Sequence, residues 1–121
     1  MTLATRRADI QAFTTKDGSI IRELMHPRGT AARHQSLAEA TVLPGRRTTL
    51  HRHARSEEIY HVTSGEGLMT LGDRAFRVAA GDTVCIPPGT PHRIGNAGAA
   101  PLVLLCACSP PYSDEDTELL E

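Results

Sequence analysis

Residues 45–65 read GRRTTLHRHARSEEIYHVTSG, and the rest of the chain is organised around this stretch. His51 and His53 lie two residues apart, so a β-strand would point both side chains to one face. Glu58 follows after a short turn and begins a strand-like run, which brings its carboxylate back beside the histidines. Two imidazoles and a carboxylate on one face are good ligands for a divalent transition metal.

Short strand-like segments separated by Gly, Pro and Asp turn signals follow one another along the chain. Gly72 and Asp73 form a good hairpin turn, and no helical period occurs before the tail. The expected strands cover residues 19–26, 35–43, 47–53, 58–63, 68–71, 75–78, 83–86, 92–94 and 102–108. This pattern predicts an all-β antiparallel sandwich or barrel.

The length of 121 residues predicts one domain, and 40% hydrophobic residues are enough to build a core. We divide the chain into an N-terminal arm (1–18), a barrel (19–112) and an acidic tail (113–121). The tail is expected to form one short helix or to stay mobile. The formal net charge is −1, which predicts neither a nucleic-acid partner nor an anionic membrane surface as a partner.

The three cysteines, Cys85, Cys106 and Cys108, predict reduced, mostly buried thiols in a cytoplasmic protein, because an odd number does not make a disulfide framework. A twin arginine near the N-terminus is not followed by the apolar region of a signal peptide, and no apolar run reaches transmembrane length. Cys106 and Cys108 share a strand face. Metal binding and reactivity are open to such a pair, but a role as small core residues is favoured.

The glycines, prolines and ligand-type residues fall into two spaced groups that resemble the two motifs of the cupin superfamily. The first group is Gly45, His51, His53, Glu58 and Gly65, and the second is Gly81, Pro87, Gly89, His92 and Asn96. The resemblance covers residues 45–96 and is to the small bacterial single-domain cupins. It implies a double-stranded β-helix (jelly-roll) barrel.

The same resemblance implies one divalent transition metal per chain, held by His51, His53, Glu58 and His92. Iron, manganese, nickel, zinc, cobalt and copper all suit nitrogen and oxygen ligands of this kind. A conical barrel lets two adjacent strands and a more distant one aim side chains at one point, which agrees with the implied set.

Three further residues are candidates for catalysis or substrate binding. Tyr60 shares a face with Glu58, so it is either a catalytic and substrate-binding residue near the metal or an ordinary core aromatic. Arg47 is expected either to bind an anionic substrate or to reach solvent. Alternation puts Glu39 on the same face as the apolar Leu37, so whether it reaches the pocket is left open. The remaining histidines are expected to be structural or surface residues: His26, His34 and His61.

These features together favour a metal-dependent enzyme acting on a small, oxygen-rich metabolite. A redox metal would suit a dioxygenase or decarboxylase, and a Lewis-acid metal would suit an isomerase or lyase. The alternative is a non-catalytic module that binds a small ligand. We also expect a homodimer, because the strand at 20–25 leaves an edge to pair and the chain resembles dimeric small cupins.

Overall fold

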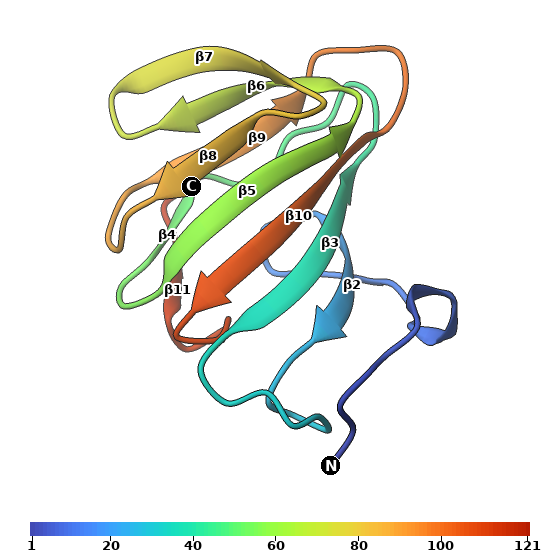
Figure 1. Cartoon of the computed structure of the whole chain (residues 1–121). Helices are drawn as coiled ribbons and strands as arrows, with labels where there is room; N and C mark the ends of the chain where they lie inside the picture. Colours follow the sequence, from blue (N-terminus) through green and yellow to red (C-terminus); the bar gives the residue numbers. More distant parts are fainter.

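The computed structural model describes residues 1–121 and consists of two antiparallel β-sheets that face each other (Figure 1). One sheet has six strands, in the order β1 (Phe13–Thr14), β2 (Ile20–Met25), β3 (Ser36–Val42), β10 (Leu102–Ser109), β5 (Glu57–Ser64) and β8 (Thr83–Ile86). The other has five, in the order β11 (Thr117–Leu119), β4 (His51–His53), β9 (His92–Asn96), β6 (Glu66–Leu71) and β7 (Arg74–Ala79). The predicted all-β barrel is confirmed.

Alternating burial along the strands places the core between the two sheets. Strand β10 buries Leu102, Leu104, Cys106 and Cys108, and the residues between them are only partly covered. Leu102, Leu104 and Cys106 join a hydrophobic cluster of 13 buried residues drawn from both sheets. Full burial of one such aliphatic side chain contributes about 1.5–3 kcal/mol, so the cluster holds the sheets at a fixed separation.

All nine expected strands are present, and two further strands form in the segments that the sequence left as arm and tail. Strand β11 pairs with β4, with Thr117 opposite His53 and Leu119 opposite His51. The tail is therefore ordered as a strand, which corrects the expectation of a short helix or a mobile end. The tail is extended because it pairs with the open edge of β4, and its own sequence preference is not what sets its conformation.

The turns at Gly65 and Gly81 have the positive φ angles that their sequence context suggests, +84° and +96°. A Cβ atom at Gly65 would lie 2.6 Å from the carbonyl oxygen of Pro101, so a side chain at this position would clash. Gly65 therefore allows β5 to turn tightly into β6 beside the start of β10.

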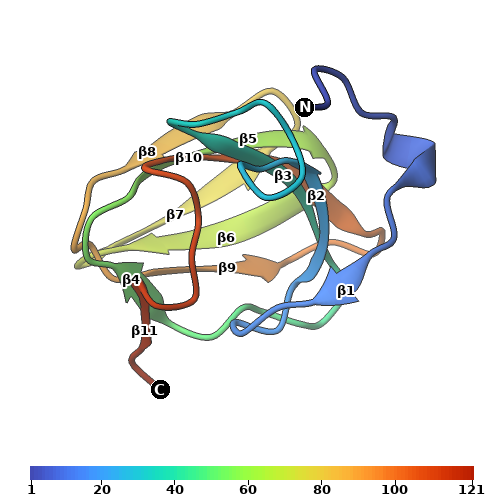
Figure 2. The same ribbon diagram turned by 90° about the horizontal axis from the view of Figure 1, so that it is seen from below.

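The N-terminal arm runs outside the barrel and contains one turn of 3-10 helix, η1 (Arg7–Asp9) (Figure 2). The Thr5 hydroxyl donates to the carbonyl oxygen of Leu24 at 2.6 Å, and Arg22 Nε donates to the carbonyl oxygen of Ile10 at 3.2 Å. Much of the β2 edge expected to pair with a second chain is thus covered by this chain's own arm. The structure contains no helix with the length and hydrophobicity needed to cross a membrane.

Candidate metal centre

The two sheets bring three histidines and a glutamate together near one end of the barrel. His51 and His53 lie on β4, His92 lies directly opposite His51 on β9, and Glu58 faces them from β5 in the other sheet. One potential ligand atom from each residue lies within 4.8 Å of the others, and all four side chains are buried. The structure thus assembles the four residues of the implied ligand set.

Hydrogen bonds to the backbone fix the tautomer of two of the histidines. Nδ1 of His51 lies 2.7 Å from the carbonyl oxygen of Thr49, and Nδ1 of His92 lies 2.9 Å from that of Thr90. A carbonyl oxygen only accepts, so both Nδ1 atoms carry a hydrogen and donate it. In the neutral ring the lone pair is then on Nε2, which points into the cluster.

The third histidine is fixed by the C-terminal strand. Nδ1 of His53 lies 2.9 Å from Oγ1 of Thr117, and that hydroxyl donates its own hydrogen to the carbonyl oxygen of Ser113 at 2.8 Å. With its one hydrogen used, the Thr117 oxygen accepts from His53 Nδ1. All three rings therefore direct Nε2 to the same point, as metal-binding histidines do when their outer nitrogen is held by the protein.

Glu58 is held by a cysteine on the neighbouring strand. Cys108 pairs directly across from Glu58, and its Sγ donates to Glu58 Oε2 at 3.3 Å. The other carboxylate oxygen, Oε1, lies 3.2 Å from His53 Nε2 and 3.4 Å from His92 Nε2. Cys108 thereby occupies one oxygen of Glu58 and leaves the other to face the histidines.

The residues present fit a cation. Nε2 of His92 is buried and has no hydrogen-bond partner, and Glu58 Oε1 faces it. With the outer nitrogens fixed as donors, the inner nitrogens and Oε1 are all electron-pair acceptors that point at one another. Buried acceptors in this arrangement repel unless a positive charge lies among them, and a divalent metal satisfies all four at once.

The same environment shifts the acid–base properties of the ligands. Burial, the largest influence on Glu58, works to raise its pKa, but the adjacent His53 and His92 rings, in their charged forms, outweigh it and lower the pKa to about 2. Burial, together with the charge of His92, lowers the pKa of His51. Both shifts keep the ligands in the unprotonated forms that bind metals.

A cavity of about 60 Å³ adjoins the cluster, and Tyr60 and Asp17 line it with His51, His53 and Glu58. Since a water needs roughly 10–15 Å³ by this measure, the cavity has room for about four to six waters or a small metabolite. Tyr60 points inward as alternation predicted, and its ring centroid lies 5.9 Å from that of His92. Asp17 was not among the sequence candidates.

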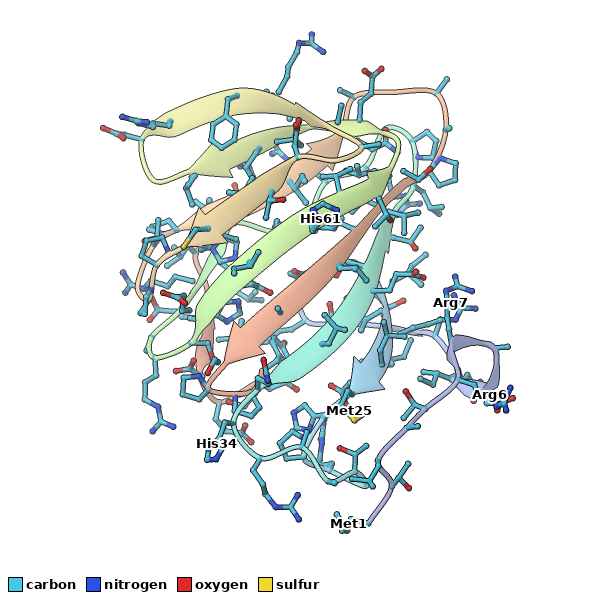
Figure 3. All side chains as sticks on the ribbon, viewed as in Figure 1. Met1, Arg6, Arg7, Met25, His34 and His61 are labelled. Carbon is cyan, nitrogen blue, oxygen red and sulfur yellow. The ribbon has the colours of Figure 1, made fainter.

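The structure does not bring Arg47 or Glu39 to this cavity, so a substrate-binding role for either stays a prediction that the cavity lining does not support. Arg47 is exposed and its backbone bridges to Gly95. Glu39 points out of β3 because its neighbours Ala38 and Ala40 face inward, and it pairs with Arg7 of the arm at 2.8 Å. Figure 3 shows Arg7, the first residue of η1, on the outside of the barrel.

The remaining histidines and cysteines lie as follows. His61 donates to or accepts from Thr83 on the outer side of β5, and His34 is exposed in the loop before β3 (Figure 3). All three cysteines are free, and Cys106 and Cys108 are buried on one face of β10. Cys85 is exposed on the outward face of β8, so two of the three thiols are buried, in line with the expectation of mostly buried thiols.

The functional residues that sequence reasoning missed are Asp17, Thr117 and Cys108 in its contact with Glu58. Asp17 precedes Gly18, and an Asp-Gly pair signals a hairpin turn. That signal could have predicted the turn but not its position over the histidines. For Thr117 no signal exists in the tail, because its role depends on β11 pairing with β4.

Comparison with known proteins agrees with this geometry. The cupin domain family model matches residues 38–108. An uncharacterised protein of Methanocaldococcus jannaschii, MJ1618, is 55% identical over 98% of this chain and 95% of its own length. Protein SchB of Streptomyces halstedii is 33% identical over 79% of this chain and 73% of its length. Mannose-1-phosphate guanylyltransferase RfbM of Salmonella typhimurium is 34% identical, but the chain spans only 16% of it.

Solved structures share the fold. Oxalate decarboxylase of Lactobacillus farciminis superposes with a TM-score of 0.80 at 24% identity, covering 93% of this chain and 34% of the decarboxylase. The nucleoside dehydratase Pac13 superposes with a TM-score of 0.80 at 20% identity, covering 100% and 92%. A double-stranded β-helix protein of Klebsiella pneumoniae gives 0.78 at 18%, covering 100% and 99%. With its fold, its matched residues and its paired motifs in agreement, the chain belongs to the cupin family.

Proposed function

We propose that this protein is a metal-dependent enzyme that binds one divalent transition metal per chain through His51, His53, Glu58 and His92. One observation carries the proposal. The Nε2 atoms of the three histidines and an oxygen of Glu58 are buried acceptors that point at one another with no hydrogen between them, and Nε2 of His92 has no hydrogen-bond partner at all. Three neutral imidazoles and one carboxylate would hold a divalent ion with a net charge of about +1.

The substrate that fits best is a small, oxygen-rich metabolite. The cavity beside the cluster is about 60 Å³, which limits the bound molecule to a few heavy atoms. A wider groove of about 660 Å³ shares Phe13, Thr15, Glu23 and Tyr112 with this cavity, and we take it as the route by which a substrate would enter from solvent. A metal at the cluster would polarise oxygen atoms of the substrate, or exchange electrons with it if the metal is redox-active.

Tyr60 is the group that would hold a proton for the reaction. Burial, followed by the nearby charge of Glu58, raises its pKa well above the ordinary value, so its hydroxyl stays protonated at neutral pH. The side chain lines the cavity and is not one of the four ligands. It is therefore suited to donate a hydrogen bond or a proton to a bound oxygen atom.

The nitrogen and oxygen ligands suit iron, manganese, cobalt, nickel, copper and zinc alike. A redox metal would favour dioxygenase or decarboxylase chemistry, and a Lewis-acid metal would favour an isomerase or lyase.

The homodimer expected from the sequence is kept as part of the proposal. A monomeric mass by light scattering at micromolar concentration would count against it.

The test is elemental analysis of protein purified without added metal. The wild type should hold close to one metal per chain, and the His51→Ala/His53→Ala double variant should hold almost none. The control is His34→Ala, which removes an exposed histidine outside the cluster. Stoichiometric metal in the double variant would overturn the ligand assignment.

The enzyme reading is tested separately with the metal-loaded protein. Small carboxylic acids, diketones and sugars, which chelate metals through two oxygens, are screened for turnover. Turnover that is lost with the metal supports the enzyme. Tight binding of such a compound without turnover would instead favour a non-catalytic ligand-binding module.

A further inference from the structure

The turn between β1 and β2, residues 15–19, places a fifth ionisable group at the metal centre. Asp17 lies in this turn, and the positive φ of Gly18, +93°, closes it. The Asp17 side chain is only 15% exposed, lines the inner cavity, and brings Oδ2 to 3.6 Å from Nε2 of His51. None of the four proposed ligands comes from this part of the chain.

Hydrogen bonds lock the orientation of the Asp17 carboxylate. Its Oδ1 accepts from the Thr15 hydroxyl at 2.7 Å, from the Ser19 hydroxyl at 2.7 Å and from the Ser19 backbone N–H at 3.0 Å. Three donors on one oxygen fix the rotamer and leave Oδ2 directed at the histidine. The turn therefore presents one carboxylate oxygen to the cluster and holds the other away from it.

At Asp17 and His51, as at Glu58 and His92, a carboxylate oxygen faces an imidazole nitrogen, and both atoms are acceptors. The Nδ1 hydrogen of His51 is used by the carbonyl oxygen of Thr49, so the neutral ring directs a lone pair from Nε2 toward Oδ2. Two electron-pair acceptors, one buried and one largely covered, face each other here as well. A cation that binds to His51 would turn this repulsion into attraction for Asp17.

We propose that Asp17 is a fifth protein ligand of the metal, and that the 15–19 turn acts as a latch that closes when the metal binds. The inference rests on the metal site of the proposed function. Asp17 is outside the four residues whose ligand atoms lie within 4.8 Å of one another, so it stands at the border of the cluster. A second carboxylate would neutralise the remaining charge of a divalent ion.

The same turn contacts two segments beside the site, the residues just before His51 and the C-terminal tail. The Thr49 N–H donates to the carbonyl oxygen of Asp17 at 2.8 Å, and Thr49 in turn accepts from His51. Nζ of Lys16 donates to the carbonyl oxygens of Asp114 at 3.2 Å and Thr117 at 2.8 Å. Metal binding at Asp17 would thus hold the arm and the tail against the barrel together.

The first test measures affinity for Co²⁺ by competition with a chelator. Asp17→Asn keeps the size of the side chain and removes its charge, and we expect it to weaken Co²⁺ binding at least tenfold, the lower end of losses seen for residues around metal sites. The matched control is Asp9→Asn, the same change at an exposed position of the arm. Equal affinity in the wild type and Asp17→Asn would overturn the proposal.

The second test uses a feature of the sequence. Lys16 is the only lysine in the chain, so a lysine-specific endoprotease cuts the native protein only between Lys16 and Asp17. Cleavage requires the turn to open, and its rate follows the open population when opening is fast. Saturating Co²⁺ should slow cleavage of the wild type at least tenfold and leave the cleavage rate of Asp17→Asn unchanged.

The two tests separate failure of the latch from failure of the metal site. If the wild type binds Co²⁺ tightly but cleavage at Lys16 is as fast with the metal as without it, the latch is wrong and the four-ligand site stands. If the wild type binds no Co²⁺, both proposals fail. Comparing each protein with and without metal removes any direct effect of the substitution on the protease.

Discussion

Thr117 Oγ1 accepts the Nδ1 hydrogen of His53 at 2.9 Å, across 64 positions of sequence. The contact exists because β11 pairs with β4 in a register that places these two residues opposite each other. The tail therefore directly supports His53, one of the proposed metal ligands. The residue before it, Asp116, accepts from the backbone N–H groups of Arg55 and Ser56, in the turn between His53 and Glu58.

Thr117→Val should weaken metal binding about 10–100-fold, the range typical for loss of a hydrogen-bond partner of a ligating histidine. Valine has the shape of threonine but cannot accept from His53, so the ring is no longer held with Nε2 inward. Chelator competition measures the change. Thr63→Val, an exposed threonine on β5, is the control and should bind metal normally. An unchanged affinity in Thr117→Val would show that the ring is held by packing alone.

Metal binding should stabilise the fold. A ligand that binds only the folded state at one hundred times its Kd contributes about 2.7 kcal/mol, which for a domain of this size raises Tm by roughly 10 °C. Differential scanning fluorimetry with and without Co²⁺ measures the shift. His92→Ala removes a ligand and should show almost no rise, whereas a full rise in this variant would mean that the metal binds elsewhere.

Asp116 should make a pH-dependent contribution to the free energy of unfolding of the metal-free protein. Burial works to raise its pKa, but hydrogen bonds from the backbone of Ser56 and Arg55 outweigh this and hold the pKa below the ordinary 3.8. Because the folded pKa is the lower one, the stabilisation is present above the unfolded pKa and is lost as pH falls through the folded value.

Asp116→Asn should accordingly lower the free energy of unfolding by about 1 kcal/mol near neutral pH, and the difference from the wild type should shrink in acid. Urea denaturation with a chelator present, at about pH 7 and about pH 3, measures it. Asp9→Asn serves as the control and should match the wild type throughout. A difference that stays constant with pH would mean that charge plays no part.

The thiols should react with different speeds. Cys85 is exposed and should label at once, whereas burial raises the pKa of Cys106 and Cys108 and leaves little thiolate to react. Mass spectrometry after brief treatment with a maleimide should find one label in the native protein and three after unfolding without reductant. Cys85→Ser should remove the fast label, and fewer than three labels after unfolding would reveal a disulfide.

Tyr60→Phe should separate turnover from metal binding. The substitution removes a hydroxyl that lines the cavity and leaves the four ligands in place, so metal content should stay at the wild-type level. Turnover of any substrate found in the screen should fall about 10²–10⁴-fold, as for loss of a general acid. Unchanged turnover would assign Tyr60 to the core.

The sequence predicts the barrel and the four-residue cluster well for a physical reason. Strand alternation places His51 and His53 on one face whatever lies around them, and the short turn at residues 54–57 returns the chain at Glu58, whereas His92 joins the set through the resemblance to the cupin motifs. Tyr60 follows from the same alternation. These features depend on the two-residue alternation of side chains along a strand and on the positions of turns, which are local properties of the chain.

The residues that support the cluster could not be predicted in this way. The side of Glu39 is left undecided by the sequence because alternation puts it with the apolar Leu37, and it is settled by the inward-facing Ala38 and Ala40 and by the ion pair with Arg7. Cys108 reaches Glu58 through the register of β5 and β10. Register between strands distant in sequence is a property of the assembled sheets, and the spacing of residues along one strand does not encode it.

The position of Thr117 near the C-terminus also determines when, during synthesis of the chain, the site can be fully formed. His53 acquires its partner only when residue 117 has been synthesised and has left the ribosome, long after the last proposed ligand, His92. A growing chain that has exposed all four ligand residues still lacks the support that fixes one of them. A metal at the proposed site would therefore be taken up by the folded chain after translation, from whatever pool surrounds it, and the abundance of each ion in that pool would bear on which metal the protein carries.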